Sequence, residues 1–254
     1  MDPGTLAGVL IGIITIMLGV VMEGSDPAAM INIPAILIVI GGTIGAAMAT
    51  GLMKDFTAAM GAGIKAMTGG TKDPTGSIAV VVDLAERARR EGLLALEESA
   101  KNLEDPFLRK GIQLAVDGTD PDELREILEA EITAKKHHGK VLSKVWADMG
   151  AFAPTMGIIG TVFGLVNVLN NLSEPENLGH MIAAAFIATL WGVFSANVLF
   201  LPIGKRTQRL SDIETQQMEL MLEGILSVQA GANPRTLHQK LTSLAGVHDD
   251  AKAA

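Results

Sequence analysis

The chain has no cysteine and no tyrosine, and only 4% of its residues are aromatic. The lack of cysteine excludes a disulfide framework, a thiolate metal site and a cysteine nucleophile. Histidine offers no cluster beyond the neighbours His137 and His138, and adjacent residues do not share a helix face. These absences disfavour an enzyme, and we predict no catalytic residue, no metal site and no cofactor.

Charged side chains are missing from long parts of the chain, although 19% of all residues are charged. Four apolar stretches contain no Asp, Glu, Lys, Arg or His: Leu6–Met22, Ile33–Met53, Met149–Leu172 and Met181–Ile203. Each is about long enough to cross a ~30 Å hydrocarbon core as a helix. A membrane protein that moves ions usually keeps an ionisable group inside the bilayer. If this chain handles ions, we therefore expect a partner to supply that group.

The distribution of basic residues predicts the topology. All 20 Lys and Arg lie outside the two short loops 23–32 and 173–180, which carry only acidic charge apart from His180. The positive-inside rule then places both termini and residues 54–148 in the cytoplasm. We interpret the first stretch as a retained helix, because no basic residue precedes it as in a signal peptide. The net charge of −8 disfavours nucleic acid as a partner.

The predicted fold is an all-α membrane protein with four transmembrane helices. Its parts are a transmembrane hairpin (1–53), a cytoplasmic helical domain (54–148), a second transmembrane hairpin (149–203), and a C-terminal cytoplasmic helix with a disordered tail (204–254). Asp105 before Pro106 and Asp120 before Pro121 predict helix starts, since Asp caps a helix and proline suits its first turn. We expect the helix after Pro121 to run unbroken into the third stretch.

Small residues recur at helical spacing in three of the four apolar stretches. The stripes are Ala184, Ala188, Gly192 and Ala196; Gly41, Gly45 and Ala49; and Gly160 with Gly164. Such stripes let membrane helices approach closely. Packing within one subunit explains any single stripe, whereas three of them together favour oligomerisation.

Few polar or helix-bending residues lie within the apolar stretches. Thr161 and Thr189 lie near the middle of the third and fourth stretches. A membrane threonine usually bonds a carbonyl one turn back, and lining an ion path is the alternative. Pro154 and Pro202 each remove a backbone donor and predict a kink, which is either a hinge or ordinary membrane-helix bending.

A run of opposite charges surrounds Gly92 in the cytoplasmic segment. On a continuous helix, Arg90 and Glu97 would share a face about 10 Å apart, too far for a direct ion pair. They would then be free to meet charges on another protein. A solvated surface with weak ion pairs is the alternative.

Several sequence segments resemble a known family across nearly the whole chain. They are the opening Met1 and Asp2, RREGLLALEE at 89–98, ADMGAFAPTMGIIGTVFG at 147–164, ATLWGVFSANVLFLPIGK at 188–205 and GANPRTLHQKL at 231–241. Together they are similar to the A subunit of the bacterial flagellar stator, the MotA and PomA family, within the MotA/TolQ/ExbB proton-channel superfamily.

The resemblance implies a pentameric ring in the bacterial inner membrane, around a dimer of a MotB/PomB-like B subunit. That partner would supply the membrane aspartate and the peptidoglycan anchor, and flow of H⁺ or Na⁺ would drive torque on the rotor. By motif position, the resemblance implies an ion-pathway or gating role for Pro154, Thr161, Thr189 and Pro202. It implies contact with the rotor protein FliG for Arg89, Arg90, Glu97 and Glu98.

Other interpretations and the identity of the ion stay open. An ExbB/TolQ-like energy-transducing subunit would have three spans, so the predicted count favours the stator. A passive structural scaffold would conduct no ions with a B subunit. Sodium-type relatives often carry Asp in the first external loop where this chain has Asn32. A sodium role for that loop is thus unsupported, and we lean toward protons.

Overall fold

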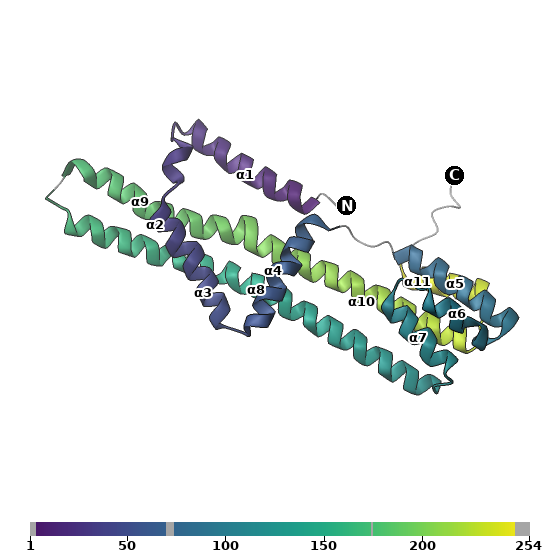
Figure 1. The fold of residues 1–254 in the computed structure, drawn as a ribbon. Helices are drawn as coiled ribbons and strands as arrows, with labels where there is room; N and C mark the ends of the chain where they lie inside the picture. The colour runs from purple at the N-terminus through teal and green to yellow at the C-terminus, as the bar shows by residue number, and fades with distance from the viewer. Residues whose placement is uncertain (1–3, 70–73, 174, 247–254) are drawn as a thin grey trace. The chain divides into compact units, whose positions relative to one another are not determined.

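The computed structural model describes residues 4–69, 74–173 and 175–246, and within these ranges every regular element is helical. The elements are α1 (Gly4–Met22), η1 (Pro27–Met30), α2 (Ile33–Ile36), η2 (Leu37–Gly41), α3 (Gly42–Ala49), α4 (Met53–Thr68), α5 (Pro74–Glu91), η3 (Leu93–Ala95), α6 (Leu96–Lys101), α7 (Pro106–Val116), α8 (Pro121–Asn170), α9 (Pro175–Phe194), η4 (Ser195–Phe200), α10 (Leu201–Gln229) and α11 (Pro234–Leu244) (Figure 1). The all-α prediction is confirmed. The opening Met1 and Asp2 and the predicted disordered tail at 248–254 lie outside the described residues.

Two helical segments are long and apolar enough to cross a membrane, Pro121–Asn170 and Pro175–Gln229. Two shorter apolar helices cover Leu6–Met22 and Ile33–Ala49. The predicted unbroken helix from Pro121 into the third apolar stretch is present as α8. The second stretch ends as a helix at Ala49, and Met53, its predicted last residue, instead begins α4.

The chain divides into two compact units, which we describe separately. Unit 1 comprises residues 1–70 and 139–210, and unit 2 comprises residues 71–138 and 211–254. This division differs from the predicted domains in two ways. The predicted cytoplasmic domain (54–148) included α4, but α4 packs with the apolar helices of unit 1. The C-terminal segment was predicted as a separate part, but its helices share one core with the central segment in unit 2. The membrane boundaries themselves stay predictions.

Unit 2 has a continuous apolar core. Its helix starts follow from capping: Asp105 accepts backbone hydrogen bonds from Phe107 and Leu108, as predicted. The core joins residues far apart in sequence, among them Leu96, Ile112, Leu124, Leu128, Ile225, Leu237 and Leu241. Helix α11 was not predicted, although Asn233 before Pro234 carries the same cap signal as Asp105. The core of the central segment is therefore completed by α10 and α11.

One ion-pair network ties three helices of unit 2 together. The Glu223 carboxylate on α10 accepts hydrogen bonds from Lys240 on α11 (2.7 Å) and Arg125 on α8 (3.2 Å). The Lys240 hydrogen bond, followed by the charges of Lys240 and Arg125, lowers the pKa of Glu223 against the opposing effect of burial. The side chain is 28% exposed, so solvent screens the network only in part.

We expect Glu223→Gln to destabilise unit 2 by about 1 kcal/mol, because a charged hydrogen-bond acceptor is lost at a half-buried position. Since the pKa of Glu223 is lowered on folding, its contribution is present above the ordinary value of 4.5 and is lost as pH falls through the lowered pKa. Thermal unfolding followed by circular dichroism at pH 7 and at acid pH checks both effects. Glu129→Gln is the control, since Glu129 is 56% exposed and lies 3.6 Å from Arg125. An equal loss in both variants would contradict the prediction.

In unit 1, α8 and α9 run side by side (Figure 1), and glycine and alanine bring their backbones close together. A Cβ added to Gly160 would lie 2.7 Å from the Ala188 Cβ, and one added to Gly192 would lie 2.6 Å from the Ala153 carbonyl oxygen. The small stripes of the third and fourth stretches therefore face each other within one chain. The third stripe differs: Gly41 and Gly45 are exposed, with no atom within 4 Å of an added Cβ.

Candidate functional site

The two threonines singled out in the apolar stretches meet between α8 and α9. The Thr161 and Thr189 hydroxyl oxygens lie 2.5 Å apart. The Thr161 hydroxyl also lies 3.1 Å from the Gly157 carbonyl oxygen, one turn back, and 2.9 Å from the Ala185 carbonyl oxygen on α9. A hydroxyl has one proton, so it can donate only one of these bonds at a time. The pair is therefore a small cluster of oxygens with alternative hydrogen bonds, and the one-turn-back bond is only one of them.

Pro154 lies on the same helix as Thr161, and Pro202 lies beyond the end of the helix that carries Thr189. Pro154 lies inside α8, and its Cα would be 3.2 Å from a Cβ added to Gly192 on α9. Pro202 is the second residue of α10 and follows η4, a π-helical turn over Ser195–Phe200. Single π-helical turns inside α-helices often mark functional sites. The kinks predicted at the two prolines stay predictions, while the π turn is a feature that sequence reasoning missed.

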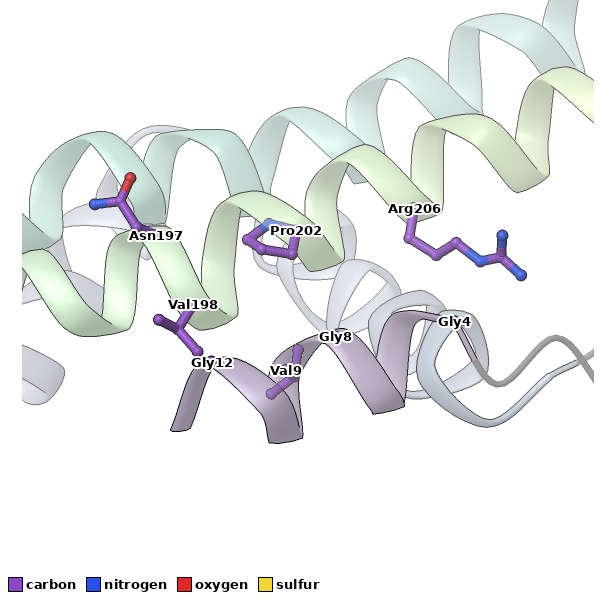
Figure 2. Close-up of a pocket in the computed structure, with 8 residues that line it drawn as sticks. All are labelled: Gly4, Gly8, Val9, Gly12, Asn197, Val198, Pro202 and Arg206. Atoms are coloured by element: carbon purple, nitrogen blue, oxygen red, sulfur yellow. The ribbon is translucent and has the colours of Figure 1, made fainter. Parts of the chain in front are cut away.

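A pocket of about 510 Å³ opens between α1 and the region around Pro202 (Figure 2). Its lining residues are Gly4, Gly8, Val9, Gly12, Asn197, Val198, Pro202 and Arg206. The glycines recur every fourth residue along α1, so they share one face of that helix. Sequence reasoning missed this stripe, although its spacing is the same as that of the stripes it identified.

The charged run around Gly92 does not form the continuous helix on which the predicted 10 Å spacing rested. Helix α5 ends at Glu91, Gly92 adopts φ +85°, and a 3-10 turn leads into α6. The arginines Arg89 and Arg90 therefore lie on one helix, and Glu97 and Glu98 lie on the next. A positive φ is cheap only for glycine, which is why the break falls at this residue.

The charges of this run point to solvent in the described structure. Arg90 pairs with Glu86 at 3.3 Å and Glu97 pairs with Lys101 at 3.1 Å, each one turn away on its own helix. Such exposed pairs are worth at most about 1 kcal/mol, so a binding partner could exchange them at little cost. Leu94, between the two helices, is 76% exposed. Arg89, Arg90, Glu97 and Glu98 belong to unit 2, whereas the threonines, prolines and pocket belong to unit 1.

Asn32 has a structural role at the end of the first loop. It is the N-cap of α2, and its side-chain oxygen accepts a hydrogen bond from the Ala35 backbone N–H at 3.1 Å. Capping satisfies a backbone donor that the first helical turn leaves unpaired.

The apolar helices, the hydroxyl cluster between α8 and α9 and the four apolar stretches without an ionisable side chain define a class: a helical membrane protein with uncharged spans. Residues 99–220 match the MotA/TolQ/ExbB proton channel family. Motility protein A of Bacillus subtilis (strain 168) is 35% identical over 257 residues, which cover 100% of this chain and 94% of that protein.

Two further likenesses agree with this match. Chemotaxis protein PomA of Vibrio alginolyticus is 35% identical over 241 residues, covering 95% of this chain and 94% of that protein. A chain in the structure of C. jejuni MotAB superposes with a TM-score of 0.94 at 32% identity, covering 100% of this chain and 99% of that one. The chain belongs to the MotA/TolQ/ExbB proton channel family and is a flagellar stator subunit of the motility protein A type.

Proposed function

We propose that this chain crosses the inner membrane four times, with both termini in the cytoplasm, and conducts H⁺ or Na⁺ only together with a MotB/PomB-like B subunit. The Thr161–Thr189 hydroxyl cluster carries the proposal, because it places exchangeable hydrogen bonds between spans that hold no ionisable side chain. The B subunit would supply the membrane aspartate and the peptidoglycan anchor. The family's occurrence in a MotAB complex supports such a partner.

The energy for rotation comes from the ion gradient. Each ion that crosses a potential of 100 mV releases about 2.3 kcal/mol. Occupancy of the partner's aspartate changes its charge, and a neutral carboxylic acid and a carboxylate make different hydrogen bonds. A hydroxyl that can either donate or accept fits both states. Ion binding would thus change how the aspartate fits the face formed by the threonines and Pro154, and the ring would step.

The proposed assembly is a pentamer of this chain around a B-subunit dimer. Support comes from the third stripe: Gly41, Gly45 and Ala49 are exposed on η2 and α3, and an added Cβ at either glycine meets no atom of the described residues within 4 Å. In a membrane, small residues of this kind favour close helix contact. The other two stripes are already used between α8 and α9.

The proposed contact with the rotor protein FliG is the charged surface around Leu94, made by Arg89, Arg90, Glu97 and Glu98. The arginines and glutamates lie on separate helices joined by η3, so the surface presents both signs of charge beside one exposed leucine. Complementary charge steers association and selects the partner. The weak local pairs of Arg90 and Glu97 leave these side chains available for exchange.

Ion flux into vesicles tests the proposal. The chain co-reconstituted with its B subunit is expected to carry protons in sodium-free buffer, and the chain alone is expected to carry none. Thr161→Val, which keeps the shape and removes the hydroxyl, is expected to lower flux at least about tenfold, as for the loss of a hydrogen bond to a charged group.

Thr50→Val is the matched control, because the Thr50 hydroxyl only bonds the Ala47 carbonyl oxygen of its own helix at 2.8 Å. Equal flux in both variants would show that Thr161 serves packing alone. Flux that requires sodium would reject protons as the coupling ion, and flux by this chain alone would reject the dependence on a B subunit.

A further inference from the structure

The pocket between α1 and α10 exists because the glycines on one face of α1 have no side chains to fill it. Its volume of about 510 Å³ falls within the ~300–1,000 Å³ typical of small-molecule sites. A Cβ added to Gly8 would meet no atom within 4 Å, and one added to Gly12 would meet only Val198, at 3.5 Å and beyond. The glycine face of α1 therefore borders open space here and does not serve close helix packing, in contrast to the glycines of α8 and α9.

The walls of the pocket are mostly apolar, and its polar lining side chains are Asn197 and the charged Arg206 (Figure 2). Val9, Val198 and Pro202 offer hydrocarbon surface, and the glycines offer backbone that is already bonded within a helix. Asn197 donates its side-chain amide to the Val193 carbonyl oxygen at 2.9 Å, so it is engaged within its own helix. Arg206 is the one formal charge among the lining residues, and its neighbours Lys205 and Arg209 do not line the pocket.

We propose that this pocket binds an anionic phospholipid of the cytoplasmic leaflet, with an acyl chain along the glycine face of α1 and the headgroup phosphate at Arg206. The predicted topology places Arg206 just beyond the cytoplasmic end of the fourth span, at the depth of the headgroups. The cytoplasmic leaflet carries negative lipid charge, and arginine binds phosphate through paired, charge-assisted hydrogen bonds.

The shape of the pocket favours a lipid over water or a free anion. A bound water needs two to four polar partners, and Val9, Val198 and Pro202 supply none along the apolar part of the pocket. A free anion would use only the Arg206 end and leave the apolar part empty. A phospholipid matches both the charged end and the hydrocarbon surface, so it is the occupant whose chemistry fits the whole pocket.

Native mass spectrometry of the complex between the full chain and its B subunit tests the proposal. The complex, extracted in detergent, is mixed with phosphatidylglycerol or phosphatidylcholine, and the bound lipid is counted per complex. Wild type is expected to retain phosphatidylglycerol in preference to phosphatidylcholine. Arg206→Gln is expected to retain about tenfold less phosphatidylglycerol, while Arg206→Lys retains an intermediate amount. Gly8→Leu, which fills the pocket, is expected to abolish retention.

Two matched controls should leave retention unchanged. Gly19→Leu adds the same bulk to α1 at a position where an added Cβ also meets open space, outside the pocket lining. Arg209→Gln removes the same charge one turn of α10 away. Equal retention in wild type, Gly8→Leu and Arg206→Gln would overturn the proposal.

Two further results would identify a different occupant of the pocket. Loss of subunits from the complex in Gly8→Leu but not Gly19→Leu would show that another protein helix fills the pocket, which overturns a lipid. Displacement of phosphatidylglycerol by inorganic phosphate alone would show a free-anion site and overturn it as well. If Arg206→Gln fails to assemble with the B subunit, the comparison of the two lipids in wild type and the Gly8→Leu result decide.

Discussion

Pro154→Ala is expected to stop flagellar rotation while the complex with the B subunit still assembles. Proline inside a helix costs about 3 kcal/mol relative to alanine, so the substitution cannot weaken α8 through helix propensity. It restores a backbone N–H that can bond the Gly150 carbonyl oxygen, and it removes the steric cause of a kink. The local geometry beside Gly192 would change, and with it the proposed fit to an aspartate of the B subunit.

The measurement has two parts, swimming of a complemented strain that lacks its own A subunit and co-purification of the B subunit from the same cells. Swimming is expected to fall to the level of the empty strain, and co-purification is expected to equal that of wild type. Loss of co-purification would show that Pro154 has a structural role. Ala151→Gly is the control, since Ala151 is exposed in the same helix and gains no backbone donor.

Gly192→Leu is expected to prevent accumulation of the folded chain. A Cβ at this position would lie 2.6 Å from the Ala153 carbonyl oxygen, 3.0 Å from the Gly157 Cα and 3.2 Å from the Pro154 Cα. All three are backbone atoms, so no side chain can rotate away and α8 and α9 must separate. Overpacking of this kind costs about 3 kcal/mol, a large part of the stability of a typical domain.

The amount of chain in isolated membranes and its co-purification with the B subunit measure this effect. Gly179→Leu on the same helix is the matched control, because an added Cβ there meets nothing within 4 Å. The control is expected to accumulate at the wild-type level. Normal accumulation of Gly192→Leu would mean that α8 and α9 do not pack at backbone distance.

Local signals predicted several elements correctly. Asp105 before Pro106 caps α7, and the absence of a strong breaker after Pro121 predicted the continuous α8. The break at Gly92 was missed, because a glycine costs only about 1 kcal/mol inside a helix and its neighbours have ordinary helix propensity. Beyond the break, Leu96 and the partly buried Leu93 pack in the core of unit 2, and that packing depends on residues distant in sequence.

The candidate site was also predicted only in part from the sequence. The residue types at Thr161 and Thr189 made them candidates, yet only the structure places their hydroxyl oxygens 2.5 Å apart. The glycines of α1 and the π turn before Pro202 were missed because their importance depends on what lies opposite them.

The residues alone show that the apolar stretches hold no ionisable group, and they predict the helices of the described residues, because charge is a property of each residue and helix signals are local. Which small residues pack and which border open space depends on how the helices are arranged in space. The same spacing closes α8 against α9 and leaves a pocket beside α1, since the difference comes from the side chains on the opposing helix.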